Sequence, residues 1–143
     1  MSNEVLFSIC NTAVLPGWLL LAILPRWKWT ARLITAVIIP GLLGLVYLYL
    51  VLTEFGKTEG GFGSLAQVQQ LFANPAMLVA GWIHYLAFDL FLGSWEVRDA
   101  QRLGLSHWLV IPCLVLTFLF GPIGLLLYFA LRAALKKQFL LGE

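Results

Sequence analysis

The sequence predicts an all-α fold, a polytopic integral membrane protein built as a bundle of four transmembrane helices. The 143 residues are 61% hydrophobic and only 11% charged, whereas soluble domains carry about 25% charged residues. A helix that crosses a bilayer needs ~20 mostly apolar residues, and four stretches meet this condition: about 5–24, 33–53, 76–95 and 108–131. We therefore expect residues 1–143 to form one four-helix transmembrane domain.

The first expected span resembles a cleaved signal peptide in its apolar character. It lacks a positively charged start and a small-residue cleavage site, and the basic residues Arg26, Lys28 and Arg32 come after it. We therefore expect a retained helix. An even number of spans places both termini on one side, and the Lys and Arg residues then divide five against four between the two faces. The face with five basic residues is expected to be the cytoplasmic one, although a difference of one barely decides the orientation. We therefore expect both termini to face outside.

The connection between the second and third spans, about 54–75, is the longest. Its first part is rich in glycine, which favours a flexible loop. Ser64, with Gln67 three residues later, then fits a capping box, and apolar residues recur behind it at helical spacing. This pattern predicts a short interfacial helix at about 64–73. An ordinary surface loop with one helical turn is the alternative.

Asn74 and Pro75 predict the start of the third helix, with Asn as the N-cap and Pro at the first helical position. Gly104 suits the position just after its end, so the helix is longer than a bilayer requires. Prolines fall inside the other three spans: Pro16, Pro40, Pro112 and Pro122. Each removes a backbone donor and tends to kink its helix, but proline is common in membrane helices and we expect ordinary kinks.

Two ionisable residues, His84 and Asp89, interrupt the third span. An ionised Asp at the centre of a span costs ~2.5–3.5 kcal/mol on insertion scales, so such residues usually face the protein interior or a water-filled cavity. At about 100° per residue, Asp89, Glu96 and Asp99 lie roughly 140°, 120° and 60° around the helix from His84. We therefore expect all four residues to share one broad, inward-facing stripe.

This stripe has a structural and a functional interpretation. In the structural one, Asn11, a tyrosine and His84 hydrogen-bond to Asp89 and hold the helices together. In the functional one, a carboxyl group in an apolar pocket keeps its proton, and a nearby imidazole or second carboxylate acts as the base. Such a pair suits isomerisation or hydration of a lipid-like substrate. We predict His84 and Asp89 as catalytic residues, with Asp89 as the acid and His84 as the base or an orienting group.

Other chemistries find little support. A Walker loop, GxSxG and HExxH are all missing from the sequence, and a net charge of +2 without a basic stripe argues against nucleic acid. His84 and His107 are expected at different depths, which disfavours haem. We expect no cofactor and no metal, although a metal site that combines His84, Asp89 and a third ligand stays open. Cys10 and Cys113 lie in apolar runs and are expected to be buried thiols.

Three stretches resemble a known family. They are WIHYLAFDLF at 82–91 with its His-x4-Asp spacing, FGPIGLLLYF at 120–129 and VLPGWLLLAILP at 14–25. They are similar to the abscisic-acid-deficient-four (neoxanthin synthesis) family, and we expect a bacterial member. The plant family is implicated in converting violaxanthin to neoxanthin, in which a 5,6-epoxide opens and a proton is lost to leave an allene. The resemblance implies that His84 and Asp89 supply the acid and the base.

We therefore expect an intramolecular isomerase that acts on a carotenoid or similar isoprenoid, integral to a bacterial inner membrane. The residues expected to contact the substrate are Asn11, Trp82, Tyr85, Phe88 and Glu96. Two alternatives stay open: a non-catalytic lipid- or pigment-binding protein or accessory subunit of a carotenoid-modifying enzyme, and a small oligomeric proton-coupled transporter. Expected partners are membrane lipids, an isoprenoid ligand and, through pairs of small residues, a second copy of the chain.

Overall fold

The computed structural model describes residues 2–141. Within this range the chain is all-α and forms no strand, as predicted. The elements are α1 (Asn3–Ala13), α2 (Leu15–Ile23), the π-helix η1 (Thr30–Ile38), α3 (Ile39–Glu54), the short 3-10 helix η2 (Phe55–Lys57), α4 (Leu65–Ala73), α5 (Pro75–Arg102) and α6 (His107–Lys136).

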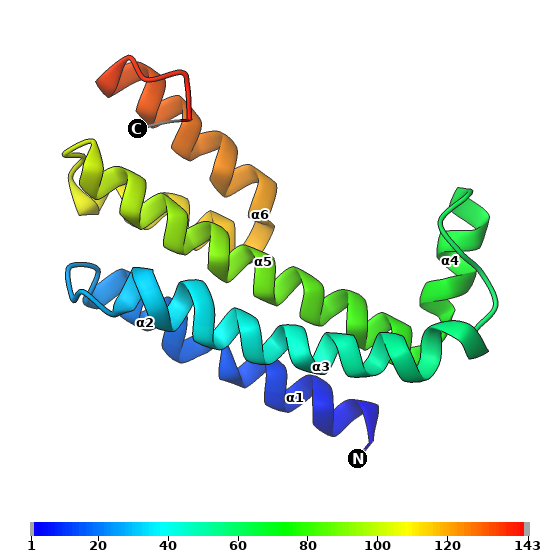
Figure 1. Ribbon diagram of the computed structural model, residues 1–143. Coiled ribbons are helices and arrows are strands. Elements are labelled where there is room, and N and C mark those ends of the chain that lie inside the picture. Colours follow the sequence, from blue (N-terminus) through cyan, green and yellow to red (C-terminus); the bar gives the residue numbers. More distant parts are fainter. Residues whose placement is uncertain (1, 142–143) are drawn as a thin grey trace.

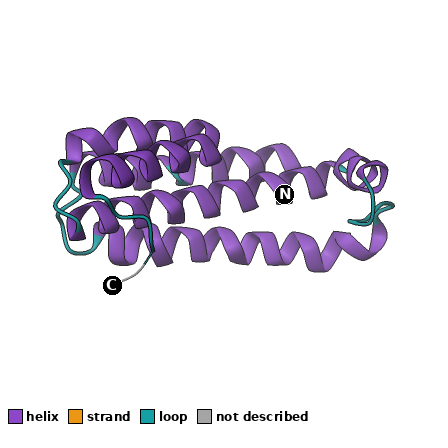
Figure 2. Ribbon diagram, turned by 90° about the horizontal axis from the view of Figure 1, so that it is seen from above, coloured by secondary structure: helices purple, strands orange, loops and turns teal. Residues whose placement is uncertain are grey.

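These elements join into four helical runs that, among the described residues, are long and apolar enough to cross a membrane: Asn3–Ile23, Thr30–Lys57, Pro75–Arg102 and His107–Lys136. The predicted fold class is thereby confirmed. Helix α5 is the centre of the molecule and packs against α1, α2, η1, α3, α4 and α6 (Figure 1). Seen from above, the long helices lie side by side with their axes nearly aligned (Figure 2).

The two predicted helix starts are confirmed by their caps. The Ser64 side chain accepts a hydrogen bond from the backbone N–H of Gln67 at 3.2 Å, and α4 follows directly. The Asn74 side-chain oxygen accepts from the backbone N–H groups of Ala76 (2.8 Å) and Met77 (3.2 Å), and α5 begins at Pro75. The side chain of the N-cap residue thus determines where α5, the helix with most of the polar residues, begins.

Helix α6 is bent back on itself. Phe120 has φ −146° and ψ 57°, which is not helical, and it precedes Gly121 and Pro122. The first half of α6 begins with the His107 ring 2.9 Å from the carbonyl oxygen of Ala22. The second half runs back along α5 and carries Arg132 to the far end of that helix (Figure 1). The fourth run is therefore a helical hairpin whose turn reaches only part of the way along α5.

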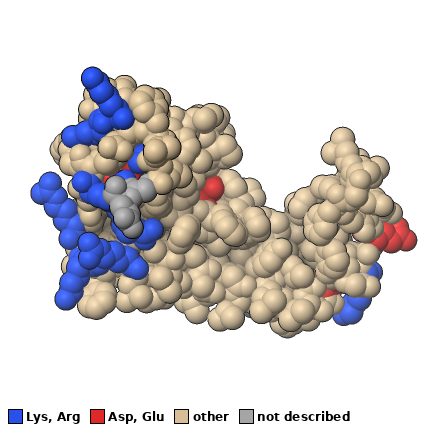
Figure 3. Space-filling model, turned by 45° about the horizontal axis from the view of Figure 1, so that its top comes forward, with Lys and Arg blue, Asp and Glu red and all other residues tan. Residues whose placement is uncertain are grey.

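The hairpin changes the expected topology. Because α6 reverses direction at Phe120, α6 ends at the opposite end of the molecule from the start of α1 (Figure 1). The expectation that both termini lie on one side is wrong, and so is the five-against-four division of basic residues. Of the nine Lys and Arg residues, Lys57 ends η2, at the end where α1 begins, and the other eight lie in or beside the ends of α2, α5 and α6 and the start of η1. The blue surface accordingly gathers at the end away from α4 (Figure 3).

The helices are held together by two apolar clusters along α5. One surrounds Ile83 and contains Cys10, and the other surrounds Leu90 and contains Cys113. Both cysteines are buried, as predicted. A Cβ at Gly93 would lie 2.8 Å from the Trp18 ring, so a glycine is needed where α2 approaches α5 closely.

Candidate functional site

The candidate site is an open face of α5, which we call the α5 saddle: Gly81, His84, Tyr85, Phe88 and Asp89. Helical spacing places these five residues on one side of α5. His84 and Phe88 are exposed, and Tyr85 and Asp89 are half-buried. The saddle lies between α4 and the turn of α6, where the molecule is hollowed (Figure 3).

The two ends of the saddle are covered by close contacts. A Cβ at Gly81 would lie 2.7 Å from the ring of Phe72 in α4. At the other end, a Cβ at Gly121 in the α6 turn would lie 2.5 Å from Oδ1 of Asp89. Between these contacts the face of α5 is open, and His84 and Phe88 are exposed there.

Asp89 is the most unusual residue of the saddle. Its Oδ2 atom is buried and has no hydrogen-bond partner among residues 2–141. A buried polar atom without a partner costs free energy, so native proteins rarely keep one without a ligand, a water molecule or a functional reason. Asp89 is therefore the residue of the saddle best placed to meet a bound molecule.

Tyr85 fixes the α6 turn beside Asp89. Its hydroxyl donates a hydrogen bond to the backbone oxygen of Phe118 at 3.1 Å. Pro122 has no N–H, so the carbonyl four residues earlier, that of Phe118, lacks its helical donor. Tyr85 supplies the missing donor. The sequence gives one signal for this link: Pro122 leaves the Phe118 carbonyl without a helical donor, so another side chain must donate to it.

His84 lies at the opposite edge of the saddle from Asp89. Its ring stacks on Phe88, with centroids 4.6 Å apart, and lies 5.7 Å from the ring of Tyr47 in α3. It also lines a cavity of about 220 Å³ between α3, α4 and α5. His84 and Asp89 thus contact different helices, with Tyr85 and Phe88 between them on the helix surface. The structural interpretation, in which His84 hydrogen-bonds to Asp89, is not what the structure contains, because His84 faces α3 and α4 while Asp89 faces α6.

Asn11 is hydrogen-bonded to Trp82 and not to Asp89. Its side-chain oxygen accepts a hydrogen bond from the Trp82 indole at 3.1 Å, which links α1 to α5. Trp82 packs against Phe7 and Tyr85, with ring centroids 5.8 Å and 5.2 Å away. The expected bond from Asn11 to Asp89 is therefore wrong, since Asn11 lies on the α1 side of α5.

Glu96 and Asp99 face inward, as predicted, but they lie under the α6 hairpin and outside the saddle. Glu96 is fully buried and accepts a hydrogen bond from the Thr117 hydroxyl, 2.9 Å and 3.1 Å from its two oxygens. Asp99 accepts from the Tyr128 hydroxyl at 2.7 Å and lies 2.6 Å from Nε of Arg132. These contacts hold both halves of the hairpin on α5, and a contact between Glu96 and a substrate stays a prediction.

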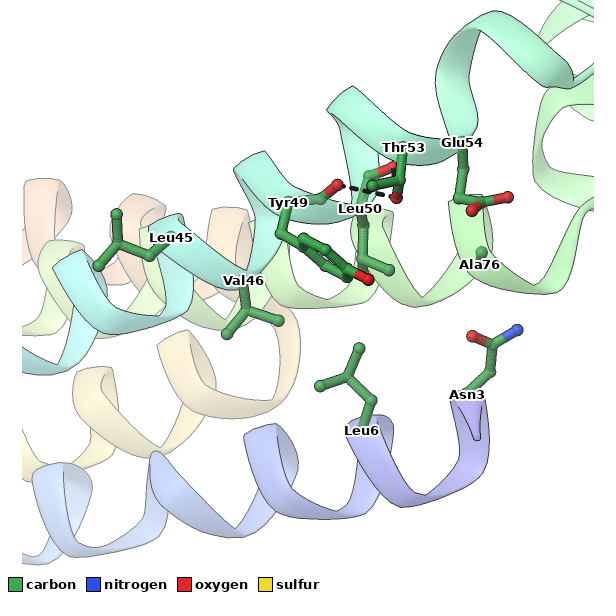
Figure 4. Close-up of a pocket in the computed structure, with 9 residues that line it drawn as sticks. All are labelled: Asn3, Leu6, Leu45, Val46, Tyr49, Leu50, Thr53, Glu54 and Ala76. Atoms are coloured by element: carbon green, nitrogen blue, oxygen red, sulfur yellow. Dashed lines mark hydrogen bonds between the residues drawn. The ribbon is translucent and has the colours of Figure 1, made fainter. Parts of the chain in front are cut away.

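A larger cavity, of about 590 Å³, lies between α1, α3 and the start of α5 (Figure 4). Its lining is apolar toward Leu45 and polar toward Asn3 and Glu54 (Figure 4). No histidine lines it, and it contains neither Asp89 nor its neighbours. In the part of the chain that the structure describes, no three His, Cys, Asp or Glu side chains gather to hold a metal ion. We therefore place the candidate site at the α5 saddle.

The fold and the saddle define a class of protein: an all-α membrane protein with an aromatic, ionisable surface that opens sideways from its central helix. A family model described as ABA DEFICIENT 4-like matches residues 5–128, and the chain belongs to this ABA4-like family. The match includes the saddle and the α6 turn, and the predicted family resemblance is confirmed.

One curated relative is Protein ABA DEFICIENT 4, chloroplastic, from Arabidopsis thaliana. The two proteins are 26% identical over 142 residues, which cover 93% of this chain and 63% of the relative. This chain therefore spans less than two thirds of the length of that relative. No solved structure matches the chain. The relative is named as a chloroplast protein, and the bacterial inner membrane stays a prediction for this chain.

Proposed function

We propose that this protein binds a carotenoid or similar isoprenoid on the α5 saddle and isomerises it by acid–base catalysis. The observation that carries the proposal is the buried Oδ2 of Asp89, which has no hydrogen-bond partner among residues 2–141, next to the exposed ring of Phe88. Membership of the ABA4-like family supports the carotenoid as the substrate class.

The proposed reaction converts an epoxide into an allene and a hydroxyl group. The carboxyl group of Asp89 gives a proton to the epoxide oxygen as the carbon–oxygen bond breaks. A base, for which His84 is the candidate on the saddle, removes a proton from the neighbouring carbon, and that electron pair forms the new double bond. Return of the proton from His84 to Asp89 restores the enzyme. Atoms and electrons balance within the substrate, so no oxidant or reductant is needed.

The position of the aromatic residues supports this assignment. Phe88 lies between His84 and Asp89 on the helix surface and is 62% exposed. A polyene that stacks on Phe88 would have the carboxyl group on one side and the imidazole on the other. Such a ligand would enter sideways from the bilayer and would not need to pass through water.

The test is to express the chain in a host that makes epoxycarotenoids and to separate the pigments by chromatography. The wild type should create a new isomer of unchanged mass, and Asp89→Asn should abolish it. Glu4→Gln is the matched control, because Glu4 is an exposed carboxylate at the start of α1. An unchanged pigment profile with the wild type, or full activity of Asp89→Asn, would overturn the proposal. Pigment that co-purifies equally with both proteins without conversion would favour the pigment-binding alternative.

A further inference from the structure

The two ends of the molecule carry opposite charge. We call one end, formed by the ends of α2, α5 and α6 and the start of η1, the basic end. It contains eight Lys and Arg residues: Arg26, Lys28, Arg32, Arg98, Arg102, Arg132, Lys136 and Lys137. The exposed ones account for the blue surface at this end (Figure 3). The opposite end combines Lys57 with Glu4, Glu54 and Glu59, one positive against three negative charges, a net charge of −2 among the described residues.

Three of the eight cations already serve the fold. Arg132 is buried against Asp99, Arg102 lies 2.7 Å from Oδ1 of the same carboxylate, and Arg98 donates to the backbone oxygen of Ala31 at 2.6 Å. The other five are exposed and make no ion pair with residues 2–141: Arg26, Lys28, Arg32, Lys136 and Lys137. Folding therefore leaves a concentrated positive charge without a counterion from the described chain.

Tryptophan side chains place this charge at the depth of lipid headgroups. Trp27, Trp29 and Trp108 lie at the same end and are 48%, 44% and 80% exposed. Trp is enriched where hydrocarbon meets water, so these rings mark the membrane interface. Lys28 lies over the Trp29 ring, 4.8 Å from its centroid. The exposed cations thus stand at the level of the phosphate groups of a bilayer.

We propose that the basic end is a binding surface for anionic phospholipid headgroups, and that it fixes this end of the protein in the more anionic leaflet. Polybasic segments are attracted to an anionic membrane surface, and the net negative charge of the opposite end is repelled by it. The α6 hairpin is essential to the surface, because it returns Lys136 and Lys137 to the same end of the molecule as Arg26 and Arg32 (Figure 1). This proposal does not depend on any reaction at the α5 saddle.

The test is to reconstitute the purified full chain into nanodiscs of mixed phosphatidylglycerol and phosphatidylcholine and to measure, by native mass spectrometry, which lipids stay bound. The wild type should retain phosphatidylglycerol at least ~5-fold above its share of the disc, the effect of about one cation at a membrane surface. The preference should fall with added salt. A variant with all five exposed cations changed to Gln should lose it, and Lys136→Gln with Lys137→Gln should lose part of it. Lys57→Gln is the matched control and should keep it.

Equal retention of the two lipids by the wild type would overturn the proposal. A variant with all five exposed cations changed to Gln that still keeps the preference would also overturn it. Inorganic phosphate should reduce the preference no more than sodium chloride of the same ionic strength. A larger effect of phosphate would show a site for free phosphate and would also overturn the proposal.

Discussion

The close packing of the two halves of the α6 hairpin predicts that Gly124→Ala strongly destabilises the protein. A Cβ at this position would overlap the backbone nitrogen and the hydroxyl of Thr117 and would lie 2.6 Å from its Cα. Overpacking usually costs about 1–3 kcal/mol, and here the contact is with backbone atoms that cannot rotate away. Moving Thr117 also weakens its hydrogen bond to the buried Glu96, which costs about 1 kcal/mol more. We therefore expect Gly124→Ala to lower the free energy of unfolding by about 2–4 kcal/mol.

Gly44→Ala is the matched control. Gly44 also lies inside a long apolar helix, but a Cβ there meets nothing within 4 Å. Ala is favoured over Gly inside a helix by up to about 1 kcal/mol, so this variant should equal or exceed the wild type. The assay is maleimide labelling of Cys113, which is fully buried, against temperature in a Cys10→Ala background. If Gly124→Ala protects Cys113 as well as Gly44→Ala does, the close packing of the hairpin halves is refuted.

Three further predictions concern the contacts of α6. Tyr85→Phe should cost about 0.5–1.5 kcal/mol in the same labelling assay, because it leaves the Phe118 carbonyl unpaired; no loss would mean that this bond does not hold the turn. Asp99→Asn should cost about 3–5 kcal/mol, since it leaves the buried Arg132 without its carboxylate. Arg132→Gln should cost less, because Arg102 and Tyr128 still pair with Asp99. The double variant should cost clearly less than the sum in a double-mutant cycle, and simple additivity would show that the two residues do not interact. Reporter fusions should place the amino terminus and the carboxyl terminus on opposite sides of the membrane, with the carboxyl terminus on the cytoplasmic side, and both on one side would refute the hairpin topology.

The sequence was sufficient for the features that depend on local chemistry. The caps at Ser64 and Asn74 predicted the starts of α4 and α5, because a side-chain oxygen that accepts N–H groups of the first turn needs no distant partner. Hydrophobic length predicted the four apolar helical runs in the same way. The inward direction of Glu96 and Asp99 also followed from helical spacing.

The reversal of α6 was not predicted, because it depends on distant contacts. Pro122 in the sequence predicts only an ordinary kink, since proline alone does not decide whether a helix bends slightly or turns back. The turn is settled by its partners: the Tyr85 hydroxyl on the freed carbonyl, and Asp99 binding Arg132 after the reversal. Without the reversal, Arg132 is expected at the end of the molecule where Lys57 lies, whereas the structure places it beside Asp99 at the opposite end. The separation of His84 from Asp89 also depends on distant contacts. The helix α4 covers the edge of α5 near His84 and the α6 turn covers the edge at Asp89, and the sequence of α5 alone does not show which helix covers which edge.

The central claim is that Asp89 acts as an acid on a bound isoprenoid. The most direct measurement is turnover of a carotenoid epoxide by the purified protein in liposomes, followed by chromatography, with the wild type and Asp89→Asn compared at equal pigment occupancy. Loss of a general acid should lower the rate about 10²–10⁴-fold while the pigment stays bound. Equal turnover by the two proteins, with equal binding, would contradict the assignment of Asp89.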